Sequence, residues 1–265
     1  MGMREINIGD IDMSVSVTGQ GRKPLLFVHG FPLDHTMWVE QAAGLAATHR
    51  LIIPNLRGFG DSGVTLGTVT MEQFADDLAT LLDRLEITEP ITLCGLSMGG
   101  YIAWQFWRRH ADRLGRLILC DTRAATDTEE VRRARLIMAE QVISQGVEAA
   151  TAPMLEKLVA PSTLAGKPDI ISALKQMMIH NPPEGVAAAQ RGMAERPDVS
   201  GWLGKIDVPT LVVCGEDDGI SPPEEMHEIA AAMPQATFVC LADAGHMSPL
   251  ENADDFNDAV REFLG

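Results

Sequence analysis

The sequence predicts an α/β fold with a mostly parallel, eight-stranded sheet, helices on both faces and an inserted helical cap. From Leu25 onward, short apolar runs alternate with helical patterns, which is typical of parallel strands covered on both sides. In residues 123–206 the strand-like runs disappear and helical patterns follow one another. These two observations predict one sheet domain that carries a helical insertion.

Each expected strand is a short apolar or alternating run. The eight runs are Ile6–Ile8, Met13–Thr18, Leu25–Val28, Leu51–Pro54, Ile91–Cys94, Leu117–Cys120, Leu211–Cys214 and Phe238–Leu241. Between the fourth and fifth runs, Thr70-Met71-Glu72-Gln73 resembles a capping box and opens an amphipathic helix. We expect that helix to cover one face of the sheet.

We expect residues 1–122 and 207–265 to form the core, and residues 123–206 to form the cap, inserted after the sixth strand. Glycine and proline residues divide the cap into several helices. The cap lies between the strand ending at Cys120 and the strand beginning near Thr210. It should therefore lie over the carboxyl edge of the sheet.

A G-x-S-x-G motif, Gly95-Leu96-Ser97-Met98-Gly99, follows the fifth strand and precedes a helical pattern. A strand that turns directly into a helix lifts the serine above the sheet edge in a strained positive-φ conformation, so the residues two positions away must be small. Alone, this motif also fits a glycine-rich turn of any α/β protein. The partners of Ser97 therefore decide its meaning.

Candidate partners lie just after later strands, in the order expected for this motif. Gly215-Glu216-Asp217-Asp218 follows the seventh strand, and Ala244-Gly245-His246 follows the eighth. Asp121, directly after the sixth strand, is a further candidate for the acid. Upstream, His29-Gly30-Phe31-Pro32 follows the third strand, where a loop with oxyanion-binding N–H groups is expected.

At these motifs the chain resembles the α/β-hydrolase superfamily, in particular its small bacterial carboxylesterases, enol-lactonases and cofactor-free perhydrolases. The resemblance extends to Arg57-Gly58-Phe59-Gly60-Asp61-Ser62 and is loosest in the cap. It implies that Asp218 is the acid, because this aspartate stands fourth in its motif and precedes Ile220-Ser221-Pro222, as in similar enzymes. Asn55 stands where similar proteins usually carry aspartate, at a position that looks structural in the family.

The resemblance and the residue types together predict a serine carboxylic-ester hydrolase that acts through an acyl-enzyme on small to medium apolar esters. Ser97 would attack the carbonyl carbon, His246 would accept and return the proton, and Asp218 would orient the imidazole. The backbone N–H groups of Phe31 and Met98 would bind the oxyanion. Activity should fall as His246 becomes protonated below neutral pH.

Other functions use the same residues. One is a lactonase of the 3-oxoadipate enol-lactonase type, whose carboxylate-bearing substrate would need a cation such as Arg123, Arg191 or Arg196. A perhydrolase or a non-haem haloperoxidase-like enzyme would use the same triad. A catalytically silent ligand-binding protein on this fold is a remote alternative. Haloalkane dehalogenases and epoxide hydrolases are disfavoured, because related proteins with those activities carry aspartate in place of Ser97.

Several residues are candidates for supporting roles. Trp38, Met138 and Met154 are expected to line the substrate pocket, since methionine adapts to varied apolar groups, although core packing is the commoner fate of such side chains. His29 is expected to brace the oxyanion loop by hydrogen bonding and not to act in catalysis.

No cofactor and no metal are expected. The four cysteines, Cys94, Cys120, Cys214 and Cys240, fall in four different strands without close pairs, and we expect small buried side chains there. His227-Glu228 lacks the second histidine of a zinc motif. Gly58–Gly63 matches G-x-G-x-x-G, but no helix opens directly after it, which disfavours a dinucleotide site.

Composition narrows the partners. The formal net charge of −16 disfavours nucleic acid and anionic membranes, since both would repel the surface. No apolar run approaches the roughly 20 residues of a membrane span, and the N-terminal residues do not form a signal peptide. We therefore expect a cytoplasmic protein whose partner is a small-molecule ester or lactone.

Overall fold

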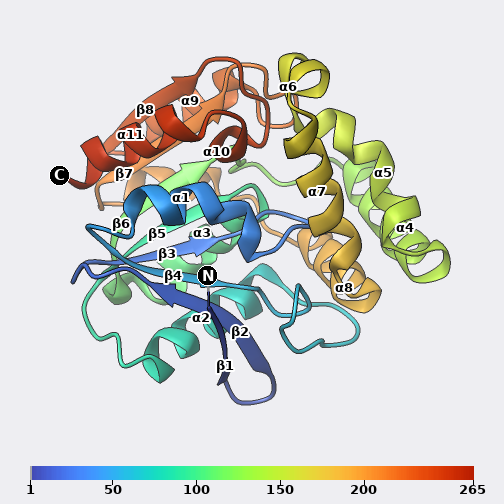
Figure 1. The fold of residues 1–265 in the computed structure, drawn as a ribbon, viewed down its shortest axis with the longest axis horizontal. Coiled ribbons are helices and arrows are strands. Elements are labelled where there is room, and N and C mark those ends of the chain that lie inside the picture. Colours follow the sequence, from blue (N-terminus) through green and yellow to red (C-terminus); the bar gives the residue numbers. More distant parts are fainter. Residues whose placement is uncertain (1) are drawn as a thin grey trace.

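The computed structural model describes residues 2–265 and contains one 8-stranded sheet with the strand order β1-β2-β4-β3-β5-β6-β7-β8 (Figure 1). The strands are β1 (Met3–Asn7), β2 (Asp12–Thr18), β3 (Pro24–Val28), β4 (Arg50–Pro54), β5 (Ile91–Leu96), β6 (Leu114–Cys120), β7 (Thr210–Gly215) and β8 (Ala236–Leu241). The pairs β1·β2 and β2·β4 are antiparallel, and the remaining pairs are parallel. This confirms the predicted α/β fold.

Two helical layers cover the sheet. One face packs against η1 (His35–Trp38), α1 (Val39–Leu45) and α11 (Ala253–Leu264), and the other against α2 (Met71–Arg84), α3 (Met98–Arg109) and α9 (Pro223–Ala232). Alternate residues of β3 belong to different core clusters: Leu25 and Phe27 face the first layer, while Leu26 and Val28 face the second. A strand buried on both faces needs apolar residues at every position, which explains its unbroken apolar run.

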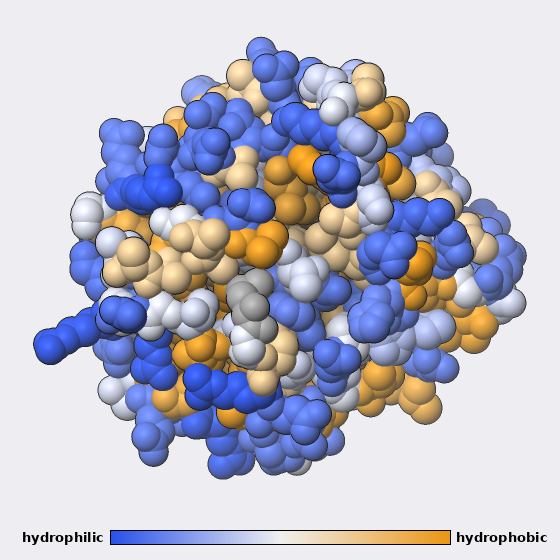
Figure 2. All heavy atoms as spheres, in the orientation of Figure 1, coloured by the Kyte–Doolittle hydropathy of each residue, from blue (hydrophilic) through white to orange (hydrophobic). Residues whose placement is uncertain are grey.

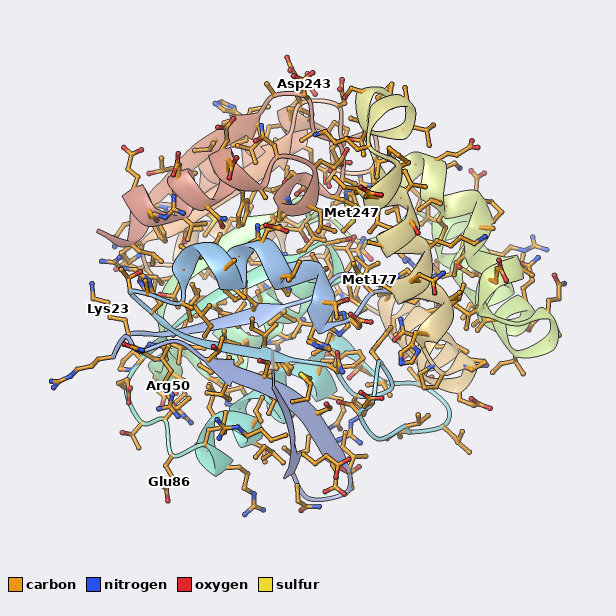
Figure 3. All side chains as sticks on the ribbon, in the orientation of Figure 1. Lys23, Arg50, Glu86, Met177, Asp243 and Met247 are labelled. Carbon is orange, nitrogen blue, oxygen red and sulfur yellow. The ribbon has the colours of Figure 1, made fainter. Side chains whose placement is uncertain are left out.

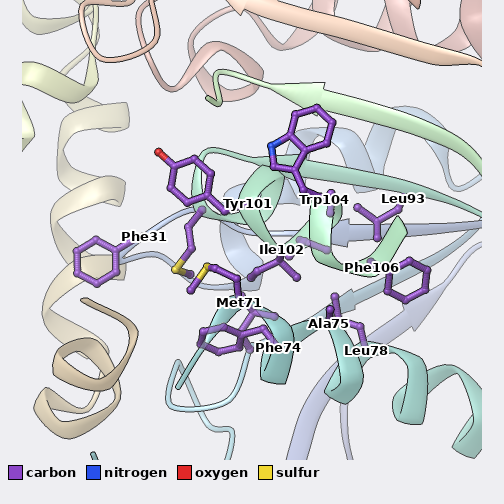
Figure 4. Close-up of a cluster of buried hydrophobic side chains, with 14 of the residues drawn as sticks. Phe31, Met71, Phe74, Ala75, Leu78, Leu93, Tyr101, Ile102, Trp104 and Phe106 are labelled. Atoms are coloured by element: carbon purple, nitrogen blue, oxygen red, sulfur yellow. The ribbon is translucent and has the colours of Figure 1, made fainter. Parts of the chain in front are cut away.

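The α2–α3 side of the core is closely packed (Figure 4). Thr70 caps α2, and its side chain accepts a hydrogen bond from the Gln73 N–H at 3.2 Å. Phe74 and Leu78 of this helix are fully buried against the sheet. In the close-up, Phe31 and Tyr101 lie at the end of this cluster that is nearest the cap. This end is the carboxyl edge of the parallel strands.

Helices fill the chain between β6 and β7. They are α4 (Glu129–Gln145), α5 (Val147–Leu158), α6 (Pro161–Gly166), α7 (Pro168–His180) and α8 (Pro183–Ala194), followed by the short helix η3 (Ser200–Lys205). In Figure 1 the helices α4 to α8 stand at one side of the sheet, beyond the strand ends, with α4 packed on α8. The remaining short helices of the described chain are η2 (Ala111–Arg113) and α10 (Ser248–Glu251).

Two details differ from the sequence prediction. Cys94, Cys120 and Cys214 are buried as expected, but Cys240 is exposed because β8 is an edge strand with only one sheet neighbour. The first strand covers Met3–Asn7, earlier than expected, and Ile8 already belongs to the following turn. Among residues 2–265, none of the helices is both long and apolar enough to cross a bilayer.

Candidate active site

The turn between β5 and α3 places Ser97 at the carboxyl edge of the sheet. Ser97 has φ 53° and ψ −110°, a strained conformation for a residue with a side chain. Its N–H donates to the Cys120 carbonyl at 2.9 Å, and its own carbonyl accepts from Thr122 Oγ1 at 2.8 Å. A Cβ atom on Gly95 would lie 2.4 Å from the Gly99 carbonyl oxygen, so the turn requires glycine there. Ser97 itself remains partly exposed.

The structure brings together the three residues predicted as a triad. His246 Nε2 lies 2.8 Å from Ser97 Oγ, and His246 Nδ1 lies 2.8 Å from Asp218 Oδ2. The side chains of His246 and Asp218 are almost completely buried. An ionised Asp218 accepts the Nδ1 proton, which leaves the lone pair of Nε2 directed at the Ser97 hydroxyl. This is the tautomer that a general base requires.

Asp218 is held in its charged form by several donors. Its Oδ1 accepts from the N–H groups of Ile220 at 2.8 Å and Ser221 at 3.1 Å, and its Oδ2 accepts from Ser221 Oγ at 2.6 Å. Burial alone would raise the pKa of Asp218, but His246 and the hydrogen bonds from Ser221 outweigh burial and hold this pKa below its usual range. The sequence prediction quoted Ser221 as part of the motif after Asp218 but gave it no role in the site.

Asp121, the alternative acid, lies close to Asp218 but has different hydrogen-bond partners. It is fully buried with φ 46°, its Oδ1 accepts from the Gly215 N–H at 2.9 Å, and its Oδ2 lies 2.5 Å from Ser248 Oγ. Burial and the negative charge of Asp218 raise the pKa of Asp121 well above its usual range. Asp217 is exposed. Of the three aspartates, Asp218 is the one hydrogen-bonded to His246 in the described structure.

The predicted oxyanion donors belong to the residue after Ser97 and to the loop after β3. Met98 is the first residue of α3, and Phe31 follows Gly30, on which a Cβ atom would lie 3.5 Å from the Ser97 Cβ. Within residues 2–265, no backbone hydrogen bond outside the regular elements uses the N–H of Phe31 or Met98 as its donor. Their role as oxyanion donors stays a prediction. The positive end of α3 favours negative charge at the same place.

The loop that carries Phe31 is braced by His29. Its Nδ1 lies 2.9 Å from the Gly30 carbonyl oxygen, and its Nε2 accepts the Leu56 N–H at 3.0 Å. Complete burial lowers the pKa of His29 to about 4, so the ring is neutral near neutral pH and can donate through one nitrogen while accepting through the other. Next to Leu56, Asn55 Oδ1 accepts from the backbone N–H of His35 at 2.9 Å, which fits a structural position.

The three residues predicted to line the pocket are placed differently. The ring of Trp38 is completely buried, 4.8 Å from the ring of Phe27 and 6.3 Å from that of Phe256 between centroids. Since none of its surface is accessible to a water molecule, Trp38 belongs to the core and does not line a pocket. Met138 and Met154 are partly buried cap residues that pack against a buried cluster to which both the cap and the α2–α3 side of the core contribute. Their role in a pocket stays a prediction.

A large open groove runs along the junction of the cap with the core. It has a volume of about 1200 Å³ and lies between α7, α1 and the α10–α11 segment. Figure 2 shows apolar side chains at the base of this hollow. Met177 of α7 and Met247, the residue after His246, lie where the cap meets the core (Figure 3) and belong to one buried cluster. Neither Ser97 nor His246 lines the groove itself.

The glycine-rich segment after β4 has a structural explanation. Arg57 is buried and forms ion pairs at 2.7 Å with Asp10 and with Asp77. Asp77 is buried on α2, so this pair ties the loop to the helix layer. The two carboxylates compensate the positive charge of Arg57, so the presence of this arginine is explained without a bound nucleotide.

Comparison with known proteins places this geometry in a family. The family model described as "alpha/beta hydrolase fold" matches residues 23–253. The structure is similar to that of a thermophilic esterase from Thermogutta terrifontis, with 46% identity and a TM-score of 0.96 over 100% of this chain and 98% of that chain. An enol-lactonase from Burkholderia xenovorans shows 29% identity and a TM-score of 0.91 over 98% and 99% of the two chains.

Curated sequences give the same placement. The 3-oxoadipate enol-lactonase 2 of Acinetobacter baylyi is 27% identical over 96% of this chain and 94% of its own length. The similarity thus spans the core and the cap in relatives of nearly the same size. The fold, the strained turn between β5 and α3 at Ser97 and the matching family model agree: the chain belongs to the α/β-hydrolase fold family.

Proposed function

We propose that this protein hydrolyses carboxylic esters through an acyl-enzyme formed on Ser97. The observation that carries the proposal is the continuous hydrogen-bonded chain from Ser97 Oγ through the His246 imidazole to Asp218, with 2.8 Å at each junction. Ser97 is partly exposed at one end of this chain, while Asp218 is buried at the other. Such an arrangement activates a neutral hydroxyl that would otherwise be a weak nucleophile.

The reaction follows from these positions. Ser97 Oγ attacks the ester carbonyl carbon as its proton passes to His246 Nε2, and the carbonyl oxygen becomes an oxyanion. The imidazolium then protonates the leaving alcohol as the C–O bond of the ester breaks. Water attacks the acyl-enzyme with the same base, and Ser97 regains its proton when the carboxylic acid leaves. Asp218 stays ionised and stabilises the imidazolium in both halves.

The N–H groups of Phe31 and Met98 are the proposed oxyanion donors. They lie next to Ser97 and are not used in the backbone hydrogen bonds of the described chain outside its regular elements. A donor fixed before the reaction costs no reorganisation in the transition state, and the loss of one such donor typically costs about 3 kcal/mol. The neutral ring of His29 holds this loop in place through Gly30 and Leu56.

An ester substrate is favoured over a carboxylate-bearing lactone. Arg123 pairs with Glu225 at 2.9 Å, and Arg191 donates to the Gly67 carbonyl at 2.9 Å. Arg196 pairs with Asp127 at 2.7 Å and lies over the Tyr101 ring at 4.2 Å. Each of the three arginines considered as an anchor for a substrate carboxylate therefore already has a protein partner.

The relatives support this choice of reaction. An esterase shares 46% of its residues with the chain, against 29% for the enol-lactonase of known structure. A bromoperoxidase from Bacillus anthracis, at 23% identity, shows the fold alone. The partly buried methionines of the cap are suited to small or medium apolar acyl groups.

Hydrolysis of p-nitrophenyl acetate, butyrate and octanoate tests the proposal. The wild type should release p-nitrophenol with each ester, and Ser97→Ala should abolish the enzymatic rate. Ser144→Ala, an exposed serine on α4, is the matched control and should keep the wild-type rate. If none of the esters is hydrolysed, or if Ser97→Ala is as active as the wild type, the proposed function is wrong.

A further inference from the structure

A buried carboxylate lies beside the loop that carries His246. Glu251, the last residue of α10, is only 4% exposed. Its Oε1 accepts from the backbone N–H groups of Gly245 at 2.9 Å and Met247 at 3.2 Å, the two neighbours of His246. Its Oε2 accepts from the Ala160 N–H of the cap at 2.7 Å. One carboxylate thus contacts both sides of His246 and the cap at once.

These contacts meet a specific need of the loop. Residues 242–247 lie between β8 and α10, so their N–H groups have no strand or helix ladder to join. A buried carboxylate is expensive unless hydrogen bonds compensate its charge. Here three backbone N–H groups do so, and hydrogen bonds to an ionised acceptor are about twice as strong as neutral ones. Glu251 and the loop therefore fix each other's geometry.

The same point attaches the cap to the loop by further contacts. The Met247 N–H also lies 3.1 Å from the Leu158 carbonyl oxygen, and Lys167 Nζ donates to the Glu251 backbone carbonyl at 2.6 Å. A Cβ atom on Gly245 would lie 2.5 Å from the Ala160 nitrogen, so the two backbones are in close contact. The junction of α5 and α6 is thereby bonded directly to the segment that carries the general base.

We infer that Glu251 is a positioning residue. It keeps the His246 imidazole within hydrogen-bond distance of Ser97 and fixes the position of the cap relative to the loop that carries His246. The inference rests on the proposed function, because it concerns the base of that reaction. His246 Nε2 is within 2.8 Å of Ser97 Oγ only while the backbone on both sides of His246 stays in place. Displacement of about 1 Å in such an arrangement can cost about 100-fold in rate.

The test compares Glu251→Gln with Glu225→Gln. An amide at position 251 keeps the size of the side chain, but its NH2 group faces backbone donors and cannot accept from them. Glu225 is also a partly buried glutamate between core and cap, paired with Arg123, and it has no contact with His246. Unfolding by urea is measured for both variants so that the kinetics are taken where each is fully folded.

The readouts are kcat and KM for p-nitrophenyl butyrate, and the rate at which a p-nitrophenyl phosphonate ester modifies Ser97. Glu251→Gln should lower kcat and the phosphonylation rate about 10- to 100-fold with a small change in KM. Glu225→Gln should leave both rates near the wild-type values. A purely structural role would lower only the urea midpoint of Glu251→Gln.

The outcomes separate this inference from the proposed function. If the wild type is active and Glu251→Gln keeps its kcat and phosphonylation rate while folded, the positioning role is overturned. If instead the wild type neither hydrolyses esters nor reacts at Ser97, the proposed function itself fails. Glu251→Asp supplies a second measurement: its shorter side chain cannot span Ala160 and Gly245 together, so its kcat should also fall below that of the wild type.

Discussion

The core and the cap hold their side chains in different ways. At the carboxyl edge of the sheet, Ser97, Asp218 and His246 are fixed by strand ends, tight turns and buried hydrogen bonds. The cap presents several large apolar side chains to solvent, namely Val131, Leu136, Ile137, Ile143 and Leu164. It is joined to the core by the Arg123–Glu225 pair, by the Glu251 contacts and by buried side chains that the cap and the core share.

This difference separates two tasks. In the proposed reaction, proton transfer between Ser97 and His246 depends on a distance near 2.8 Å, which a close-packed core maintains. Selection among acyl chains needs only an apolar surface of suitable shape, and we propose that partly buried methionines such as Met154 contribute to it. We therefore expect substitutions at the sheet edge to change kcat, and substitutions in the cap to change the preference among substrates.

Among substitutions around Ser97 that keep the nucleophile, the largest effect is expected from Asp218→Asn. An amide at this position offers an N–H group to His246 Nδ1, which favours the tautomer that protonates Nε2 and so removes the base from Ser97. We expect kcat for p-nitrophenyl butyrate to fall about 10⁴-fold with the fold retained. Steady-state kinetics at neutral pH and circular dichroism measure the two quantities.

Asp121→Asn and Asp217→Asn are the controls for this substitution. Asp121, whose pKa burial raises, makes no hydrogen bond to His246 in the described structure, and Asp217 is exposed, so both variants should keep kcat near the wild-type value. A collapse of kcat in Asp121→Asn together with an active Asp218→Asn would reverse the assignment of the acid.

A smaller effect is expected on stability, through His29. In the unfolded chain this side chain takes up a proton below about pH 6.5, but burial lowers its folded pKa to about 4. The unfolded state therefore binds more protons between these values, and stability is lost as the pH falls through this window. Between about pH 7.5 and about pH 5, the contribution of His29 to the free energy of unfolding should fall by about 2 kcal/mol.

Urea unfolding of the wild type and of His29→Gln at both pH values isolates this contribution, because the other titrating groups are common to the two proteins. The glutamine carries no titratable charge, so the stability advantage of the wild type should narrow as the pH falls. An advantage that stays constant across the window would mean that His29 is not held neutral by burial.

Motifs and hydrophobic periodicity predicted the core well, because its strands and the turn at Ser97 each depend on residues that are close together in the sequence. Seven of the eight predicted runs lie within strands and the first overlaps β1 only in part, while the glycine spacing around Ser97 reflects a close backbone approach within a few residues. Asp218 and His246 follow strand ends, so the sheet itself brings them together. The placement of Trp38 was wrong because an aromatic residue after a motif looks the same in sequence whether it packs inward or lines a pocket.

Features that depend on long-range contacts left no such signal. Glu251 looks like an ordinary charged residue at a helix end, yet its carboxylate meets Ala160, far away in the chain. Asp121 could be weighed as an acid from its place after β6, but only the fold shows its carboxyl bonded to Gly215 and Ser248. In the cap, the hydrophobic periodicity of the sequence is weak, because helices such as α4 leave part of their apolar side chains exposed to solvent.

The smallest expected effect tests the cap side of the comparison. If Met154 contacts the acyl chain, Met154→Ala should lower the ratio of kcat/KM for octanoate to that for acetate by about fourfold, the equivalent of the ~0.8 kcal/mol of one buried methylene group. Met3→Ala is the control, because Met3 is an equally half-buried methionine on the edge strand β1. An unchanged ratio in Met154→Ala, with normal kcat for acetate, would show that this methionine only packs against the core, and would place acyl selection in another part of the cap.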